Sequence, residues 1–172
     1  LSRLSDLAQE DDIIVTDAGA TLAWVMQSWK VKKGQRIISS WNHSPMGWAL
    51  PGAIGVGLTG RRVICITGDG SFQMNIQELA TLARLGLNVK VFVLDNQGYG
   101  IISQTQDTWL EGRHYASEFK GPDYDMIADA YLSYYDTQTW GMSLNAIGPQ
   151  VTIVPIAPNA RIVPKLIPAK RL

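Results

Sequence analysis

The sequence predicts an α/β fold in which an open, mainly parallel sheet carries helices on both faces. Five short runs rich in β-branched residues are almost continuously apolar, as is typical of strands buried on both sides of a parallel sheet. Longer helix-like stretches lie between most of these runs, and strands that alternate with helices form parallel sheets with right-handed crossovers. With 172 residues, 46% of them hydrophobic, the chain is expected to form one domain, residues 1–172.

The predicted elements follow one another along the chain. Strands are expected at residues 13–16, 36–39, 63–67, 89–94 and 151–156. Helices are expected at residues 19–29, 45–58, 75–85 and 123–130. Residues 101–123 mix polar and aromatic side chains without a period, which predicts a long functional loop or a lid. An extended tail that wraps around the domain or onto a partner is predicted because four prolines would interrupt any helix there: Pro155, Pro158, Pro164 and Pro168.

The composition argues against several classes of function. Lys and Arg number 15 and Asp and Glu number 15, so no basic surface is expected to gather nucleic acid or an anionic membrane. No apolar run reaches the roughly 18 residues of a membrane span, and residues 1–10 lack the pattern of a signal peptide. We therefore expect a cytoplasmic protein without nucleic-acid or membrane partners. The single cysteine, Cys65, lies in an apolar run and is interpreted as a buried structural thiol.

The turn after the third predicted strand is the first candidate site, because ligands of open α/β sheets bind outside the carboxyl ends of the strands. This turn consists of Gly68, Asp69, Gly70 and Ser71. Its two glycines let the backbone approach an anion closely, and the free N–H groups of the following helix attract phosphate. A carboxylate there would repel phosphate unless a divalent cation lay between them. Asp69 therefore predicts a metal ion, and an all-oxygen site favours Mg²⁺.

The next predicted strand ends in a second polar turn that contains Asp95, Asn96, Gln97 and Gly98. Asn96 follows Asp69 by 96 − 69 = 27 residues, an interval that holds one helix and one strand. The two turns can therefore face the same crevice. Each turn alone is typical of a plain reversal of the chain, whereas the pair at this spacing predicts a joint diphosphate and metal site.

This pair of turns resembles the signature of thiamine diphosphate (ThDP) dependent enzymes, in which Gly-Asp-Gly is followed by a helix, a strand and an Asn. The resemblance implies that Asp69, Asn96 and the backbone carbonyl of Gly98 bind Mg²⁺. Backbone N–H groups near Gly70 and Ser71 would hold the diphosphate. The expected cofactor site also includes Gly68, Asn96, Gly98, Tyr99, Gly100 and Ile101.

A further segment, residues 41–55, resembles the acetolactate synthase-like group of these enzymes. Its WNHSPMGWALPGAIG sequence contains that group's Met-Gly-x-x-Leu-Pro-x-Ala-Ile-Gly pattern, and residues 68–80 resemble the same group. The resemblance implies that Met46 supports the bent V conformation of the cofactor and that the Ser44 carbonyl accepts a hydrogen bond from the 4′-amino group. Met46 alone would be typical of a core methionine. The resemblance covers about residues 17–102, roughly half of the chain.

Two features depart from the family pattern. Thr105 follows Gln104 where acetolactate synthases place a substrate-selecting tryptophan, which weakens an assignment to branched-chain biosynthesis. Between Tyr131 and Gly148 the family has a strand, a helix and a short loop, and this chain has only residues 132–147. Either the chain carries a deletion there or, as we prefer, residues are missing from the sequence, which a Cα to Cα step well above about 3.8 Å would reveal.

The resemblance implies non-oxidative, ThDP-dependent decarboxylation of a pyruvate-like 2-oxo acid, with carboligation of the product to a carbonyl acceptor. The glutamate that activates the cofactor belongs to a separate pyrimidine-binding domain, so no catalytic residue is assigned in this chain. Glu78 is expected at the wrong end of the cofactor. We expect the chain to be the C-terminal part of a longer enzyme that works as a homodimer or homotetramer. FAD is compatible with the group, and nothing in this chain indicates it.

Three alternatives stay open. The first is a simple 2-oxo acid decarboxylase, in which a proton replaces the acceptor. The second is a cofactor-binding or interaction module without turnover. The third is an NAD-dependent oxidoreductase, since Gly55 to Gly60 fit the Gly-x-Gly-x-x-Gly pattern of dinucleotide sites. That pattern must follow a strand and open a helix, whereas here it ends a helix-like stretch, so a helix terminus is the preferred interpretation.

Overall fold

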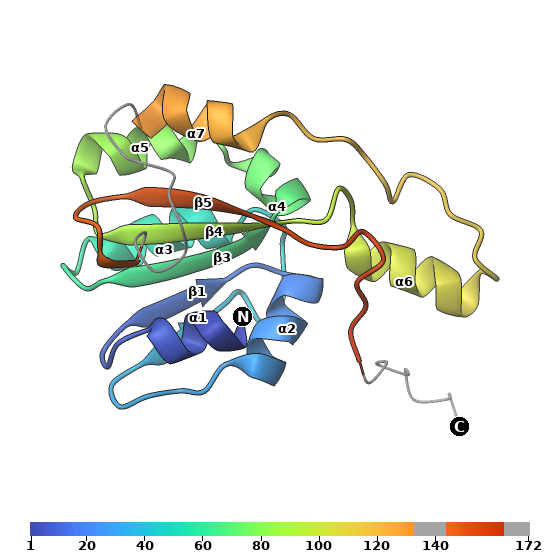
Figure 1. Cartoon of the computed structure of the whole chain (residues 1–172), viewed down its shortest axis with the longest axis horizontal. Helices are drawn as coiled ribbons and strands as arrows, with labels where there is room; N and C mark the ends of the chain where they lie inside the picture. The colour runs from blue at the N-terminus through green and yellow to red at the C-terminus, as the bar shows by residue number, and fades with distance from the viewer. Residues whose placement is uncertain (133–143, 164–172) are drawn as a thin grey trace.

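The computed structural model describes residues 1–132 and 144–163, and it confirms the α/β fold (Figure 1). Five parallel strands form one sheet in the order β2-β1-β3-β4-β5. Each strand end lies within one residue of its predicted position. The strands are β1 (Ile13–Thr16), β2 (Arg36–Ile38), β3 (Val63–Gly68), β4 (Val89–Asp95) and β5 (Gln150–Pro155).

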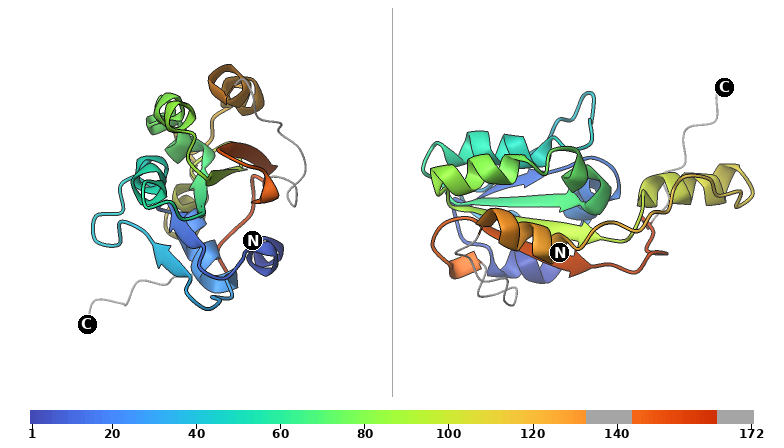
Figure 2. Two further views of the ribbon diagram at one scale, coloured as in Figure 1. Left: turned by 90° about the vertical axis from the view of Figure 1, so that its left-hand side faces the viewer. Right: turned by 90° about the horizontal axis from the view of Figure 1, so that it is seen from above.

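Helices cover both faces of the sheet, as the sequence predicts (Figure 2). Successive strand residues point to opposite faces. On one face, Cys65 lies in a hydrophobic core cluster with buried residues of three helices, α3 (Ala49–Gly57), α5 (Glu78–Leu85) and α7 (Tyr124–Leu132). On the opposite face, Ile64 lies in a second hydrophobic core cluster with buried residues of α1 (Ser2–Leu7) and α2 (Ala20–Ser28). Because both faces are covered, the strands have the continuous apolar runs from which they were predicted.

Two predicted helices begin differently from expectation. The helix predicted at residues 45–58 begins only at Ala49, because residues 41–48 form turns in which Gly47 has a φ of 82°. The helix predicted at 75–85 is α5, which begins only at Glu78, and a separate helix that was not predicted, α4 (Asp69–Met74), begins directly at the end of β3.

The prediction of a loop over residues 101–123 is wrong for its first part, where α6 (Gly100–Trp109) extends away from the sheet (Figure 1). This helix was hidden because its buried residues are polar: Ser103, Gln104 and Gln106. The Gln104 amide explains how such a face is buried. Its oxygen accepts from the Ile162 N–H at 2.9 Å, and its nitrogen donates to the Ile162 carbonyl at 3.0 Å.

Several expectations concern parts of the chain that the structure does not describe. The proposed chain break in residues 132–147 falls largely on residues 133–143, and Pro164 and Pro168 also lie outside the described residues. Within the described part of the chain, no helix has the length and apolar run needed to cross a bilayer.

The connectivity of the sheet fixes where a ligand can bind. The chain passes from β1 to β2 on one side and then returns to place β3 on the other side of β1. The strand order therefore reverses between β1 and β3, which is where open α/β sheets form a crevice. In the register of β3 and β4, Gly68 lies beside Leu94. The residues that follow them, Asp69 and Asp95, therefore lie at neighbouring positions in the two predicted turns.

Candidate cofactor and metal site

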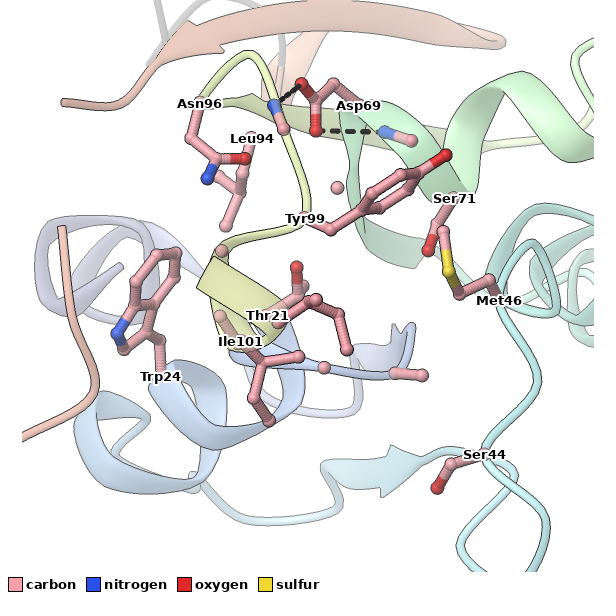
Figure 3. Close-up of a pocket in the computed structure, with 18 residues that line it drawn as sticks. Thr21, Trp24, Ser44, Met46, Asp69, Ser71, Leu94, Asn96, Tyr99 and Ile101 are labelled. Carbon is pink, nitrogen blue, oxygen red and sulfur yellow. Dashed lines mark hydrogen bonds between the residues drawn. The ribbon is translucent and has the colours of Figure 1, made fainter. Parts of the chain in front are cut away.

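A cavity of about 460 Å³ lies at the carboxyl ends of β1, β3 and β4 (Figure 3). The structure brings together at this cavity every residue that the sequence assigned to the cofactor or the metal. These residues are Ser44, Met46, Gly68, Asp69, Gly70, Ser71, Asn96, Gly98, Tyr99, Gly100 and Ile101. Glu78, Thr105 and the glycines of the dinucleotide-like pattern do not line it.

One wall of the cavity is formed by α2 and the turn before it. The sequence indicated this turn, residues 17–19, as one of three strand ends where a ligand can bind, but it gave these residues no role, and Ala18 and Gly19 line the cavity. The lining residues that the sequence did not indicate are Ala20, Thr21, Trp24, Leu94 and Ile102. Gly19 has a φ of 76°, a conformation that favours glycine, and it precedes the first residue of α2.

Three helices begin at the cavity: α2 after β1, α4 after β3 and α6 after β4. The first turn of each leaves backbone N–H groups without partners inside the helix and carries the positive end of the helix dipole. Among the described residues, the lining of the cavity contains no Lys or Arg side chain. An anion in this cavity would therefore be held by backbone N–H groups and by any cation that accompanies it.

Asp69 is fixed between the two strand ends. Its side chain is buried, with 2% of the residue exposed, and it accepts hydrogen bonds from the N–H groups of Gly70 at 2.9 Å and Gly98 at 3.1 Å. Burial raises the pKa of Asp69 to about 6. The two N–H groups oppose this increase in pKa, and the nearby Asp95 adds to it. A positive charge beside Asp69 would favour its ionised form.

The Asn96 amide lies between Asp69 and Gly98. One of its terminal atoms is 3.3 Å from Asp69 Oδ1 and 2.9 Å from the Gly98 carbonyl oxygen, and a nitrogen at this position donates to both oxygens. Turning the amide over would place its oxygen there instead, so that three oxygens would converge. In an octahedral Mg²⁺ site with ligands at about 2.1 Å, neighbouring oxygens lie about 3 Å apart. One carboxylate, one amide and one carbonyl therefore form a face that could hold a hard cation.

This arrangement differs from metal sites built from charged side chains or thiols. In residues 1–132 and 144–163, no group of three or more His, Cys, Asp or Glu side chains could hold a metal ion. The candidate site relies instead on an amide and a backbone carbonyl beside a single carboxylate, and phosphate oxygens would complete such a site. Hard oxygen ligands of this kind suit Mg²⁺ or Ca²⁺ and not the softer transition metals.

Aromatic side chains cover the Gly-Asp-Gly turn. A Cβ atom on Gly70 would lie 2.6 Å from the Tyr99 ring, so only glycine fits beneath this ring. Tyr99 packs against Phe119 with ring centroids 5.0 Å apart. The segment that carries Phe119 forms an antiparallel bridge with the metal-site loop, pairing Gly98 with Glu118. Phe119 thus braces the site, and no local pattern in the sequence indicated this contact.

Met46 and Ser44 lie on the loop between β2 and α3. Met46 is half-buried, and it lies across the cavity from Trp24 in Figure 3. Ser44 is exposed and has a φ of 42°, and its N–H and hydroxyl both donate to the Ser40 carbonyl. The loop therefore forms part of the cavity wall together with the turn that contains Ser71.

The fold and the cavity together define a class of protein. Residues 17–139 match the family described as thiamine pyrophosphate enzyme, C-terminal TPP binding domain, thiamine pyrophosphate being another name for ThDP. This match covers more than half of the chain, and the chain belongs to this family. The predicted membership is thereby confirmed.

Within the family, the chain is similar to acetolactate synthase large subunits. It is 38% identical over 135 residues to that of Cyanidium caldarium and 37% identical over 131 residues to that of Lactococcus lactis. It is also 37% identical over 134 residues to the isozyme 2 large subunit of Escherichia coli. These matches cover 74–76% of this chain and 23–24% of each relative. The matched part of the chain thus spans about a quarter of the length of these relatives.

Proposed function

We propose that this chain is the diphosphate- and metal-binding part of an acetolactate synthase-like enzyme. The reaction is the decarboxylation of a pyruvate-like 2-oxo acid, with carboligation of the two-carbon product to a carbonyl acceptor. The observation that carries this proposal is the convergence of the Asp69 carboxylate, the Asn96 amide and the Gly98 carbonyl in a cavity where three helices begin. A diphosphate with a hard divalent cation is the ligand whose charges match this arrangement.

Each predicted residue has a role in this proposal. Asp69, Asn96 and the Gly98 carbonyl bind Mg²⁺, and the first N–H groups of α4, at Gly70 and Ser71, bind the diphosphate. When bound, ThDP supplies the electron sink that decarboxylation requires. The residues of this chain hold it in place and exclude water from one side, through a wall that also includes Met46, Gly68, Tyr99, Gly100 and Ile101.

Among the residues that the structure describes, the lining of the cavity contains no free carboxylate that could activate the cofactor. Asp69 is the only carboxylate that lines it among the described residues, and it is committed to the metal. The activating glutamate is therefore supplied by a pyrimidine-binding domain, on the same polypeptide or on another subunit of a homodimer or homotetramer. The relatives support a longer enzyme, because the match covers only 23% of the first of them.

Calorimetry on the complete assembly, with its pyrimidine-binding domain, tests the proposal. We expect ThDP to bind only when Mg²⁺ is present, and we expect Asp69→Ala to abolish this binding. ThDP binding that is independent of Mg²⁺, or that survives Asp69→Ala, would overturn the assignment of the site.

Product analysis with pyruvate then separates the remaining activities. Acetolactate supports carboligation, whereas acetaldehyde alone identifies a simple decarboxylase. Binding of ThDP without any turnover of pyruvate or other 2-oxo acids identifies a cofactor-binding module.

A further inference from the structure

The loop that carries Met46 has little regular structure to fix its position, although it forms part of the cavity wall. Residues 39–48 lie between β2 and α3, and two of them, Ser44 and Gly47, have positive φ values of 42° and 82°. Fixing one backbone residue in one conformation costs roughly 1–2 kcal/mol of conformational entropy. Contacts from outside the loop must therefore hold this conformation.

Asp17 makes the first of these contacts. It follows β1 at the carboxyl edge of the sheet, is 1% exposed and does not line the cavity. Its Oδ1 accepts from the N–H groups of Gly47 at 3.1 Å and Ala18 at 2.9 Å. Its Oδ2 accepts from the Ala49 N–H at 3.1 Å and from the Thr67 hydroxyl at 3.3 Å. A buried carboxylate needs several donors to be stable, and half of those around Asp17 come from the Met46 loop and the start of α3.

Asn75 makes the second contact, from the opposite side of the same loop. It caps the C-terminus of α4, the helix that begins at Asp69, and its amide nitrogen donates to the Gly47 carbonyl at 2.7 Å. The N–H and the carbonyl of Gly47 are thus held by two side chains from different parts of the sheet edge. A Cβ atom on Gly47 would lie 2.8 Å from the Met74 Cβ, so the loop packs directly on the end of α4.

We propose that Asp17 and Asn75 are positioning residues that set the Met46 loop at a fixed place relative to the diphosphate turn. This inference rests on the proposed function and on the roles that the family resemblance implies, in which Met46 supports the bent conformation of ThDP and the Ser44 carbonyl binds its 4′-amino group. Asn75 joins the loop to α4, and Asp17 joins it to β1 and, through Thr67, to β3. Neither residue touches the cofactor, because neither lines the cavity.

The charge of Asp17 is essential to this role. All four of its contacts are donors, so both of its oxygens must accept. In Asp17→Asn, one oxygen becomes an NH₂ group that faces either the Gly47 and Ala18 N–H groups or the Ala49 N–H and the Thr67 hydroxyl. Either orientation breaks one anchor of the loop and leaves a buried donor without an acceptor.

The test compares two probes on the complete assembly. Mg²⁺ with inorganic diphosphate reports on the diphosphate turn alone, and Mg²⁺ with ThDP reports on the turn and the Met46 loop together. For Asp17→Asn and Asn75→Ala we expect the ThDP affinity measured by calorimetry to fall about 10-fold or more, and the affinity for inorganic diphosphate to change less than about 3-fold. At saturating ThDP, kcat should also fall, because a displaced loop misorients the cofactor.

Matched controls separate positioning from loss of stability. Asp12→Asn removes a buried carboxylate at the other end of β1, where Asp12 pairs with Arg62 at 2.7 Å. Asn88→Ala shortens an exposed asparagine, also far from the cavity. Both controls should bind the two probes as the wild type does, even where Asp12→Asn lowers the melting temperature.

Each outcome has one meaning. Variants at Asp17 and Asn75 that bind ThDP like the wild type, or that lose both probes equally, would refute the positioning role while the proposed function stands. A wild-type assembly that binds inorganic diphosphate but not ThDP, or neither of them, would refute the proposed function itself. Because Asn75 is only half-buried, Asn75→Ala keeps the test decisive if Asp17→Asn does not fold.

Discussion

The Asn96 amide lies between Asp69 and Gly98, with one terminal atom 3.3 Å from Asp69 Oδ1 and 2.9 Å from the Gly98 carbonyl oxygen. The register of β3 and β4 produces this arrangement, because Gly68 lies beside Leu94 and the chain turns toward the cavity after both. Without a cation, the amide nitrogen at this position donates to both oxygens. In the proposed metal site the amide is turned over and its oxygen is a ligand, and substitutions of Asn96 distinguish these two roles.

Asn96→Asp should keep Mg²⁺ affinity within about 10-fold of the wild type, because a carboxylate oxygen replaces the amide oxygen as a ligand. Asn96→Ala should lower that affinity by 10-fold to 100-fold, since one ligand is lost. Titration of Mg²⁺ in the presence of ThDP measures both values. If the amide nitrogen instead bonds to the two oxygens, Asn96→Asp will be the more damaging change, because it places a second carboxylate against them.

The pKa of Asp69 predicts a conflict between binding and stability. Its folded pKa of about 6 lies above the ordinary value of 3.8, so the metal-free folded state disfavours the ionised carboxylate. The free energy of unfolding of the metal-free protein should therefore rise as the pH falls from about 6 to about 4, because the folded state binds the proton first. At pH 8, Asp69→Asn should increase that free energy by about 1 kcal/mol while it abolishes Mg²⁺-dependent binding.

Urea unfolding at several pH values, in the presence of a chelator, measures this effect. The increase in stability is smaller than the full pKa shift implies, because asparagine keeps only one of the two oxygens that accept from Gly70 and Gly98. At pH 4 the variant and the wild type should differ little. A variant that is less stable than the wild type at pH 8 would contradict the prediction.

The close packing of Tyr99 on Gly70 predicts a strong effect of one methyl group. In Gly70→Ala the new Cβ would lie 2.6 Å from the Tyr99 ring, and Phe119 behind that ring prevents it from moving away freely. We expect ThDP affinity to fall at least 10-fold and the free energy of unfolding to fall by about 1–3 kcal/mol. Calorimetry and urea unfolding measure the two quantities.

Gly55→Ala is the matched control for Gly70→Ala. Gly55 lies inside α3, and no heavy atom lies within 4 Å of a Cβ atom placed there. This change should raise the free energy of unfolding by about 0.5–1 kcal/mol and leave ThDP binding unaltered. Loss of ThDP binding in Gly55→Ala would indicate that the dinucleotide-like pattern, Gly55 to Gly60, is part of a binding site.

The sequence predicts the strands of the sheet better than it predicts contacts between residues that are far apart in the chain. Continuous apolar runs located β1, β3 and β4, because burial on both faces leaves little freedom in residue choice. The edge strand β2 is exposed or half-buried, and its β-branched residues located it instead. The cavity residues after β3 and β4 followed from the rule that strand ends face one crevice. Helix α6 was missed because Gln104 is buried through bonds to Ile162, 58 residues away.

The same limit applies to the residues that support the site. The donors to Asp17 include Gly47 and Ala49, which are 30 and 32 residues away in the sequence. No local pattern distinguishes such a carboxylate from an ordinary turn residue. Phe119 is a comparable case, since it supports the site only through its contact with Tyr99, and that contact forms only in the folded chain.

The Gln104 contact predicts that α6 anchors the segment before residue 164. Gln104→Ala removes both bonds to the Ile162 backbone, so the amide of Ile162 should exchange with solvent at least about 10-fold faster. Hydrogen exchange measured by mass spectrometry reads this directly. Thr105→Ala is the control, because the Thr105 hydroxyl donates only to the Ile101 carbonyl of its own helix. Equal exchange rates in both variants would show that other contacts hold the segment.

Lys90 predicts a pH dependence of stability that is separate from the site. It is fully buried on β4, and its ammonium group donates to the carbonyls of Ala146 and Gly148. Burial, and to a smaller extent the neighbouring Arg62, together lower the pKa of Lys90 from 10.5 to about 8. Between pH 8 and pH 10.5 the unfolded chain therefore binds more protons than the folded chain, so the contribution of Lys90 to stability should rise with pH across this window.

The measurement is the difference in free energy of unfolding between the wild type and Lys90→Met, taken by urea unfolding at pH 7 and at pH 10. Relative to Lys90→Met, the wild type should be about 2 kcal/mol more stable at pH 10 than it is at pH 7. At pH 10 the folded state no longer buries a charged ammonium group, and the neutral amine keeps its bonds to the two carbonyls. Lys33→Met, at an exposed lysine, should show no such change. Parallel pH profiles for the wild type and Lys90→Met would mean that Lys90 stays charged in the folded protein throughout this range.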